Sequence, residues 1–250
     1  METLGVEVEE GTLSLASRAV RRVCPSLSHT FVHLGEEDPF LRAEGTVRLD
    51  AEHDGVRLVA AIAVEVSIAA TFPGSIPKVR ILDTELARLY PHTENATGLL
   101  CLGVNGDLLL RLATATDPYE EFFNAIVRDN LFALEYYRRY RTMPFKDRSH
   151  YDRGVLEYYE DHFSTGSDKA ALRLLQVAAR DAPYKRGNRC PCGSGLRTKD
   201  CHGDKIDELR HMVPRKALIA DLMHVADSLG MRGAVTAEET ARIRLRRRRH

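Results

Sequence analysis

The alternation of apolar and polar residues divides the chain into an early part that predicts strands and a later part that predicts helices. Residues 11–28 (GTLSLASRAVRRVCPSLS) carry apolar side chains near helical spacing and predict a short helix that Pro25 ends. Residues 41–55 and 56–82 are rich in valine, isoleucine and alanine, alternate partly with period two, and are interrupted by Asp-Gly and Pro-Gly pairs. These two segments predict three or four antiparallel strands in a meander.

Helical spacing dominates the rest of the chain, and its clearest instance is residues 116–140 (TDPYEEFFNAIVRDNLFALEYYRRY). Asp117 is a favourable N-cap and Pro118 suits the first helical position. The apolar stripe of this helix comprises Phe122, Ile126, Leu131, Leu134 and Tyr137. Further helices are predicted over residues 150–163, 169–183 and 204–230, the last broken at Pro214. Because the strands come together and the helices come together, the predicted class is α+β.

Composition and charge exclude several classes of protein. The chain has 250 residues, 44% of them hydrophobic and 29% charged, with a formal net charge of +0, which does not favour nucleic acid as a general partner. Residues 241–250 (ARIRLRRRRH) are strongly basic, so the remainder is net acidic. No apolar run approaches the roughly 20 residues that span a bilayer, and the acidic start does not read as a secretory signal. We therefore expect a cytoplasmic protein without a membrane partner.

The five cysteines are unevenly distributed, and three of them lie close together. Cys190, Cys192 and Cys201, with His202, supply three thiolates and one imidazole, which is a complete ligand set for a structural zinc ion. Four protein ligands leave no open position, so the predicted Zn²⁺ holds a fold and performs no chemistry. Cys24, at the end of the first predicted helix, is interpreted as a filler of the core.

The cysteine-rich segment CPCGSGLRTKDCH (residues 190–202) resembles the SEC-C motif, a short zinc-binding knuckle. The resemblance covers about fifteen residues. It implies a docking role for this segment and says little about the activity of the main domain.

Cys101 stands in the apolar run Leu99-Leu100-Cys101-Leu102, inside a turn-rich stretch (residues 90–110) that predicts an ordered irregular loop. A lone cysteine among leucines is usually buried and inert. The order of its surroundings points to another interpretation: a strand meander, a Tyr-Pro-His segment, the cysteine, and then a long helix. That order resembles the ubiquitin-conjugating (E2, UBC-like) fold, with the later helices and the zinc knuckle as a C-terminal helical extension.

The resemblance to E2 proteins covers roughly residues 12–141 and depends on three short segments. Residues 72–79 (FPGSIPKV) match the strand entry of the family, and residues 98–102 (GLLCL) match the segment that carries its active cysteine. Residues 90–92 (YPH) stand where the family has His-Pro-Asn, with one extra residue before the cysteine. The chain also departs from the family because it has no tryptophan.

The resemblance implies that Cys101 accepts an acyl group from the C-terminus of a partner protein as a thioester and releases it to an amine of a target. In place of the family's asparagine stands His92, which could donate to an oxyanion or remove a proton from the attacking lysine. His92 could equally only pin the loop by hydrogen bonds. Asp107 could orient an incoming lysine, or it could be a turn residue.

The divergent pattern is similar to E2-like proteins of bacterial antiphage operons, including the E2-only accessory proteins of CBASS systems. That resemblance implies the C-terminus of a cGAS-like nucleotidyltransferase as cargo; a ubiquitin-like protein is the other candidate. Two further classes stay open: a non-catalytic E2-variant adaptor that binds a protein or nucleic acid through the zinc knuckle and basic tail, and a cysteine hydrolase. The chain is also compatible with a homodimer.

The predicted organisation has four parts. Residues 1–141 form the E2-like catalytic domain and residues 142–185 a helical extension. Residues 186–204 form the zinc knuckle, and residues 205–250 supply C-terminal helices and the arginine-rich tail.

Overall fold

The chain forms two compact units that interleave along the sequence. The structure, a computed structural model, describes residues 2–32, 40–145 and 152–230. The first unit comprises Met1–Gly103 and Arg111–Asp147, and the second comprises Val104–Leu110 and Arg148–His250. The predicted α+β class is confirmed, since a four-stranded antiparallel sheet is combined with helices. The basic tail at residues 241–250 lies outside the described residues.

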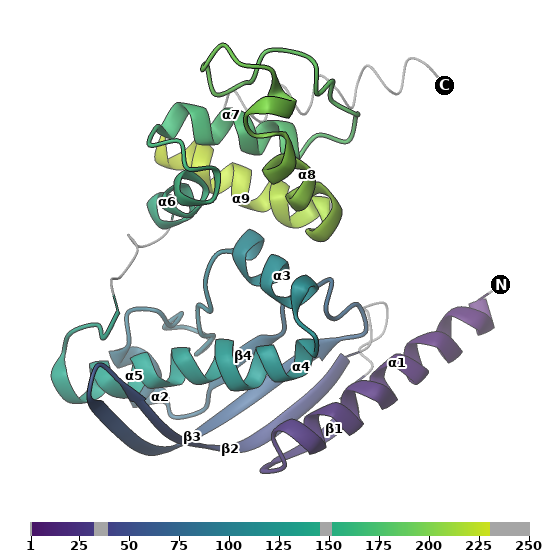
Figure 1. Ribbon diagram of the computed structural model, residues 1–250. Helices are drawn as coiled ribbons and strands as arrows, with labels where there is room; N and C mark the ends of the chain where they lie inside the picture. Colours follow the sequence, from purple (N-terminus) through teal and green to yellow (C-terminus); the bar gives the residue numbers. More distant parts are fainter. Residues whose placement is uncertain (1, 33–39, 146–151, 231–250) are drawn as a thin grey trace. The chain divides into compact units, whose positions relative to one another are not determined.

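The sheet of the first unit is a meander in the order β1-β2-β3-β4 (Figure 1). Its strands are β1 (Leu27–Val32), β2 (Phe40–His53), β3 (Val56–Ala69) and β4 (Lys78–Ile81), and all neighbours are antiparallel. Strand β1 lies outside the segments that predicted strands. It is short and half of its residues are polar, and it forms by pairing with the first half of β2.

The helices of the first unit are longer or more divided than the sequence predicts. They are α1 (Glu2–Val23), α2 (Thr84–Leu89), α4 (Pro118–Glu120), the π-helix η1 (Glu121–Val127) and α5 (Arg128–Tyr140). A further helix, α3 (Asn105–Thr114), belongs to the second unit up to Leu110 and to the first unit from Arg111. The N-cap prediction for Asp117 is confirmed, because its carboxylate accepts from the backbone N–H groups of Tyr119 and Glu120.

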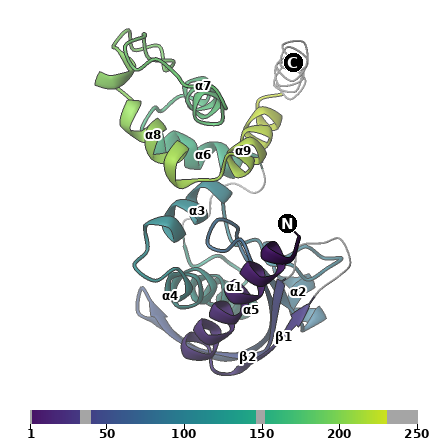
Figure 2. The ribbon, with the colours of Figure 1, turned by 90° about the vertical axis from the view of Figure 1, so that its right-hand side faces the viewer.

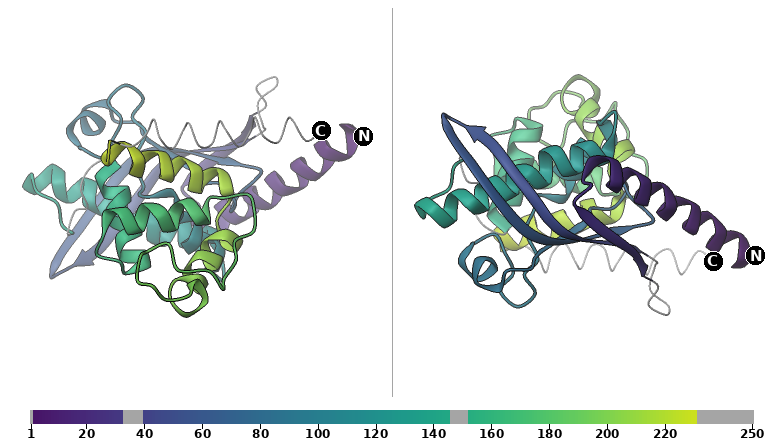
Figure 3. Two further views of the ribbon diagram at one scale, coloured as in Figure 1. Left: turned by 90° about the horizontal axis from the view of Figure 1, so that it is seen from above. Right: turned by 90° about the horizontal axis from the view of Figure 1, so that it is seen from below.

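One face of the sheet builds the core of the first unit. Along β3 every second side chain from Ile62 to Ile68 is buried, as period-two alternation requires. Helix α5 contacts β2 and β3 and runs across them, and α1 contacts β1 and β2 (Figures 1 and 3). Phe122, Ile126, Leu131 and Leu134, all predicted for the apolar stripe, are at most 1% exposed.

The π-helix explains how that stripe stays on one face although its spacing changes. Phe122 and Ile126 are four positions apart, and the next member, Leu131, follows five positions later. A π-turn adds a residue to the turn, so the five-residue step keeps Leu131 on the buried side.

The second unit is helical. Its elements are α6 (Asp152–Phe163), α7 (Asp168–Ala178), the 3₁₀ turn η2 (Thr198–Asp200), α8 (Gly203–Met212) and α9 (Arg215–Ser228). The predicted break at Pro214 falls between α8 and α9. Helix α6 contacts α7 and α9, and α7 also contacts α8 (Figure 2). Within the described parts of both units, no helix combines the length and apolar character needed to cross a membrane.

Candidate functional site

Cys101 ends a short extended segment that lies beside strand β4. The N–H of Leu100 donates to the carbonyl of Val79 at 2.8 Å, and the N–H of Ile81 donates to the carbonyl of Gly98 at 2.9 Å. The backbone before the cysteine is therefore held by the edge of the sheet, although residues 90–110 predict only an irregular loop.

A second set of backbone bonds ties the same segment to the Tyr-Pro-His stretch. The N–H of Cys101 donates to the carbonyl of His92 at 2.7 Å, and Thr93 forms an antiparallel bridge with Leu100. In an antiparallel ladder with that register, Cys101 and His92 are direct cross-strand neighbours. The structure thus brings together two of the three residues that the sequence predicts for catalysis.

The alternation along this ladder decides which way the cysteine faces. Leu100 is 7% exposed and Thr93 is 8% exposed, so this pair faces the core. Successive side chains of an extended segment point to opposite faces, and Cys101 is accordingly exposed while His92 is half-buried. A cysteine inside an apolar run is here an accessible thiol.

The turn that returns the chain to Cys101 requires a glycine. Gly98 has φ +72°, and a Cβ atom there would lie 2.8 Å from the carbonyl oxygen of Ile81. The N–H of Gly98 donates to the carbonyl of Glu94 at 2.8 Å, and the hydroxyl of Thr97 donates to the carboxylate of Glu94 at 2.5 Å. Both bonds close the turn and align the ladder.

Asn130, a residue that sequence reasoning missed, contacts the segment that follows the cysteine. Its side-chain amide donates to the carbonyl of Leu102 at 3.3 Å and to the carbonyl of Ile126 at 2.9 Å. It lies at the start of α5, directly after the π-helix. The sequence signal that could have identified Asn130 is its position as a polar residue directly before Leu131 of the apolar stripe.

Asp107 does not lie in a turn between two elements, as one reading of the sequence predicts, but in a helix. It lies in the first turn of helix α3, where an acidic side chain is favoured by the helix dipole. It belongs to the residues of α3 that are part of the second unit. The sequence of residues 105–114 predicts a turn followed by a connecting segment, because asparagine and glycine stand at its start. In the structure these residues form a regular helix.

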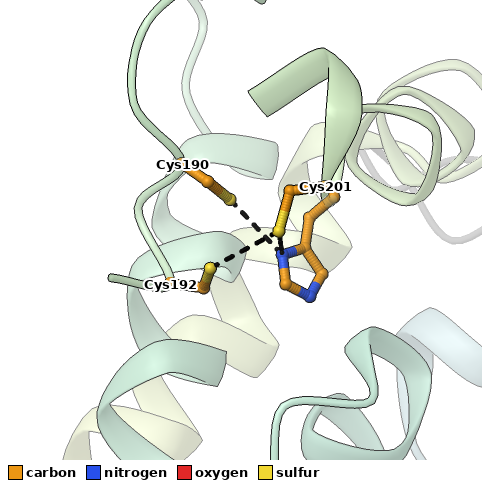
Figure 4. A group of neighbouring side chains, drawn as sticks. Cys190, Cys192 and Cys201 are labelled. Carbon is orange, nitrogen blue, oxygen red and sulfur yellow. Dashed lines mark hydrogen bonds between the residues drawn. The ribbon is translucent and has the colours of Figure 1, made fainter. Parts of the chain in front are cut away.

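The second candidate site is the cluster of Cys190, Cys192, Cys201 and His202 in the second unit. The ligand atoms of all four lie within 4.8 Å of one another, and the cluster could hold a metal ion. Sγ of Cys192 lies 3.7 Å from Sγ of Cys201, and Nδ1 of His202 lies 3.3 Å from Sγ of Cys190 and 3.1 Å from Sγ of Cys201. Figure 4 shows the sulfur atoms of the three cysteines converging on one point.

Local backbone pairing brings the early and late ligands together. Arg189 and Arg197 form an antiparallel bridge, and the N–H of Cys190 donates to the carbonyl of Leu196 at 2.8 Å. The tight reversal between them contains Gly193 at φ +91° and is closed by its N–H, which donates to the carbonyl of Cys190 at 3.2 Å. The glycine-rich segment between the early and late ligands, which the sequence predicts to form a knuckle, folds locally into this hairpin.

The imidazole of His202 is oriented by helix α6. Nε2 of His202 lies 2.9 Å from the carbonyl oxygen of Phe163, the last residue of that helix. A carbonyl only accepts, so Nε2 carries the proton and Nδ1 has a free lone pair on the side of the cysteine sulfur atoms, where it could bind a metal ion. A metal-binding histidine usually donates its other ring N–H to a backbone carbonyl or a carboxylate in the same way.

The two thiols of the CxC pair differ in acidity. Burial raises the pKa of Cys190 to about 12. Burial also acts to raise the pKa of Cys192, but hydrogen bonds from Ser194 and from the neighbouring Cys190 and Cys201 together lower that pKa to about 6. Since a metal binds thiolates, binding at this cluster would displace a proton from Cys190.

Searches of protein-family models, of curated proteins and of solved structures find no significant match.

Proposed function

We propose that the protein is an E2-like acyl carrier whose nucleophile is Cys101. The observation that carries this proposal is the exposed cysteine at the end of a sheet-anchored ladder, with Leu100 buried beside it and His92 opposite. A core cysteine would be buried, as Cys24 is at 9% exposure. An accessible thiol on a fixed backbone suits a residue that must receive and release a large cargo.

The reaction has two acyl transfers. Sγ of Cys101 attacks an activated C-terminal carbonyl of the cargo, which arrives as another thioester or as an acyl adenylate. The new C–S bond displaces the first thiol or adenylate. A target amine then attacks the thioester carbonyl, the C–S bond breaks, and the amine proton passes to a base while Cys101 regains its thiolate. In this proposal His92, the cross-strand neighbour of Cys101, donates to the oxyanion or takes that proton.

The acyl cargo and the biological setting in this proposal come from the resemblance to E2-like proteins of bacterial antiphage operons. We assign the carrier to bacterial antiphage defence, with the C-terminus of a cGAS-like nucleotidyltransferase or of a ubiquitin-like protein as the acyl group. The acceptor is an amine of a target protein.

The metal of the second unit is zinc in this proposal. With Zn–S near 2.3 Å and Zn–N near 2.0–2.1 Å, a tetrahedral ion places sulfur atoms about 3.8 Å apart and sulfur and nitrogen about 3.6 Å apart. The sulfur–sulfur contact of 3.7 Å fits the first of these distances, and the sulfur–nitrogen contacts of 3.3 and 3.1 Å are shorter than the second. Four soft protein ligands leave no position for a substrate, so the ion supplies a structural crosslink.

Intact-protein mass spectrometry under non-reducing conditions tests the carrier. We expect the wild-type chain, co-expressed with neighbouring genes, to gain a thiol-sensitive adduct. Cys101→Ala removes the adduct and Cys101→Ser converts it to a thiol-stable ester, because the serine oxygen is a poorer leaving group. Cys24→Ser is the matched control and keeps the adduct. No adduct with folded partners present rejects the carrier.

His92→Ala separates the two steps. If His92 assists aminolysis, the variant forms the thioester at close to the wild-type rate but discharges it to an added amine about 10²-fold or more slowly, the range of general acid–base catalysis. Single-turnover discharge of purified adduct measures this. An equal loss in formation and discharge assigns His92 to holding the loop.

A second candidate, the non-catalytic adaptor, is favoured by one feature of the knuckle. Arg189 and Arg197 are exposed and face each other across an antiparallel bridge, and neither forms an ion pair among the residues that the structure describes. Like charges placed directly opposite each other are unfavourable unless an anionic partner neutralises them. If the protein forms no adduct on Cys101 and binds an acidic protein through these arginines, it is an adaptor.

A further inference from the structure

Asn130 joins helix α5 to the short segment that carries Cys101, and every residue of this contact lies in the first unit. Its side-chain amide nitrogen donates to the carbonyl of Leu102 at 3.3 Å and to the carbonyl of Ile126 at 2.9 Å. The side chain of Asn130 is half-buried. One amide group therefore binds the backbone of its own helix and the backbone directly after the cysteine.

The π-helix brings Asn130 to the place where it can make both bonds. Phe122 and Ile126 are buried and four positions apart, and in an uninterrupted α-helix the next position on that face would be Asn130. The π-turn adds one residue. Leu131 then takes the core position at 0% exposure, and Asn130 lies about 100° around the helix from it. The change of helix type therefore keeps a polar side chain out of the core and leaves its amide free to reach Leu102.

Cys101 lies between two backbone groups that are each held by a hydrogen bond. Its own N–H donates to the carbonyl of His92 at 2.7 Å, within the ladder beside the sheet. The carbonyl of the next residue, Leu102, accepts from Asn130 of the helical layer. Peptide bonds are planar and rigid, so the only soft torsions between these two groups are φ and ψ of Cys101 and of Leu102. Gly103 follows at φ +139°, a conformation that favours glycine, and glycine restricts the backbone little.

We propose that Asn130 is a positioning residue for Cys101: by binding the carbonyl of Leu102 it fixes the direction in which the ladder presents the thiol. The inference rests on the proposed function for the meaning of that thiol, and it gives the π-helix a role in the carrier. Asn130 acts through the backbone and not on the acyl group. A purely structural role, in which its side chain only bonds to the carbonyl of Ile126 within the helix, gives different results below.

The test separates the two bonds of Asn130 by substitution. Asn130→Ser keeps a hydroxyl that can donate to the carbonyl four residues earlier, that of Ile126, but its single O–H leaves the carbonyl of Leu102 without this donor. Asn130→Ala removes both bonds. Asn124→Ala is the matched control, because Asn124 is an exposed asparagine of the same π-helix.

Hydrogen exchange of individual amides, followed by NMR, is the first readout. At the N–H of Cys101 exchange should be about fivefold faster in Asn130→Ser and in Asn130→Ala, the effect of losing one neutral hydrogen bond beside it. The amides of β3 in Asn130→Ser, and the Cys101 amide in Asn124→Ala, should stay within about twofold of wild type. The inference is overturned if Asn130→Ser protects the Cys101 amide as the wild type does, or if its β3 amides exchange faster by the same factor. Should Asn130→Ala fail to fold, Asn130→Ser decides alone.

The second readout is acyl transfer to Cys101 from a peptide thioester of mercaptoethanesulfonate, followed by mass spectrometry of the peptide that contains Cys101. Sγ of Cys101 attacks the thioester carbonyl and mercaptoethanesulfonate leaves as the thiolate. Asn130→Ser should lower the rate at least about threefold, since a misplaced reacting atom slows the chemical step. Hydrogen exchange needs no acyl donor. Absence of transfer in the wild type therefore rejects the proposed function alone, and an unchanged transfer rate in Asn130→Ser rejects the positioning role alone.

Discussion

Cys201→Ser is expected to abolish metal binding at the proposed zinc cluster and to unfold the knuckle of the second unit. The cluster comprises one imidazole and three thiolates, and structural zinc contributes about 10–16 kcal/mol to the folding of comparable small peptides near neutral pH. The hairpin that carries Cys190 and Cys192 is otherwise held by few bonds and has exposed glycines. Metal content per chain should fall from about one to below about one tenth.

The loss should extend from the knuckle to the end of helix α6. His202 donates to the carbonyl of Phe163, and the ammonium group of Lys205 donates to the carbonyl of His162. Both bonds satisfy carbonyls at the helix C-terminus that have no partner within the helix. Hydrogen exchange should therefore rise in residues 186–202 and at the end of α6, while β2 and β3 keep their protection.

Cys101→Ser is the matched control for this experiment, since it removes an exposed thiol outside the cluster and should keep the metal. A colorimetric chelator, added after denaturation, measures metal content in both variants. Acidification should release the metal from the wild-type chain as well, because thiolates must be deprotonated to bind. Full metal content in Cys201→Ser would contradict the four-residue site.

Gly106→Ala is expected to destabilise the second unit by about 0.5–2 kcal/mol. Helix propensity alone favours alanine by about 1 kcal/mol, so the intrinsic effect has the opposite sign. The added methyl group, however, would lie 2.2 Å from the hydroxyl oxygen of the fully buried Tyr159. Relieving that clash means overpacking, which costs about 1–3 kcal/mol, or breaking the hydrogen bond from that hydroxyl to the buried Asp221 of helix α9, which costs about 1.5–3 kcal/mol.

Gly187→Ala is the matched control, because nothing lies within 4 Å of a Cβ atom there. We expect it to change the free energy of unfolding by less than about 0.5 kcal/mol. The slowest-exchanging amides of α6 and α9 report the stability of the second unit in each variant. A Gly106→Ala protein as stable as wild type would show that Tyr159 and Asp221 can rearrange without cost.

Features that depend on a few neighbouring residues could be read from the sequence. Asp117 and Pro118 start a helix by contacts within one turn, and Pro214 separates α8 from α9 because proline cannot continue a helix. The meander follows from period-two alternation. The metal cluster belongs to the same group, since all four ligands lie within residues 190–202 and the turn chemistry between them is local.

Features that depend on distant partners could not be read in this way. Strand β1 has a weak pattern of its own and forms because β2 offers an edge. Helix α3 begins at Asn105-Gly106, a pair that indicates a turn in isolation. It becomes helical where Asp221, 115 residues from Gly106, accepts from the backbone N–H of Gly106 and from the side-chain amide of Asn105.

The sequence by itself therefore determined the α+β class, the capped helices and a cluster able to hold a metal, because short-range sterics, capping and ligand spacing act within a few residues. The tertiary structure decided that Cys101 is exposed beside His92, that Asn130 contacts its segment, and that Asp221 holds the start of α3. The physical reason is that exposure and non-local hydrogen bonds depend on which surfaces meet, and a buried carboxylate is stable only where the folded chain brings enough donors to it.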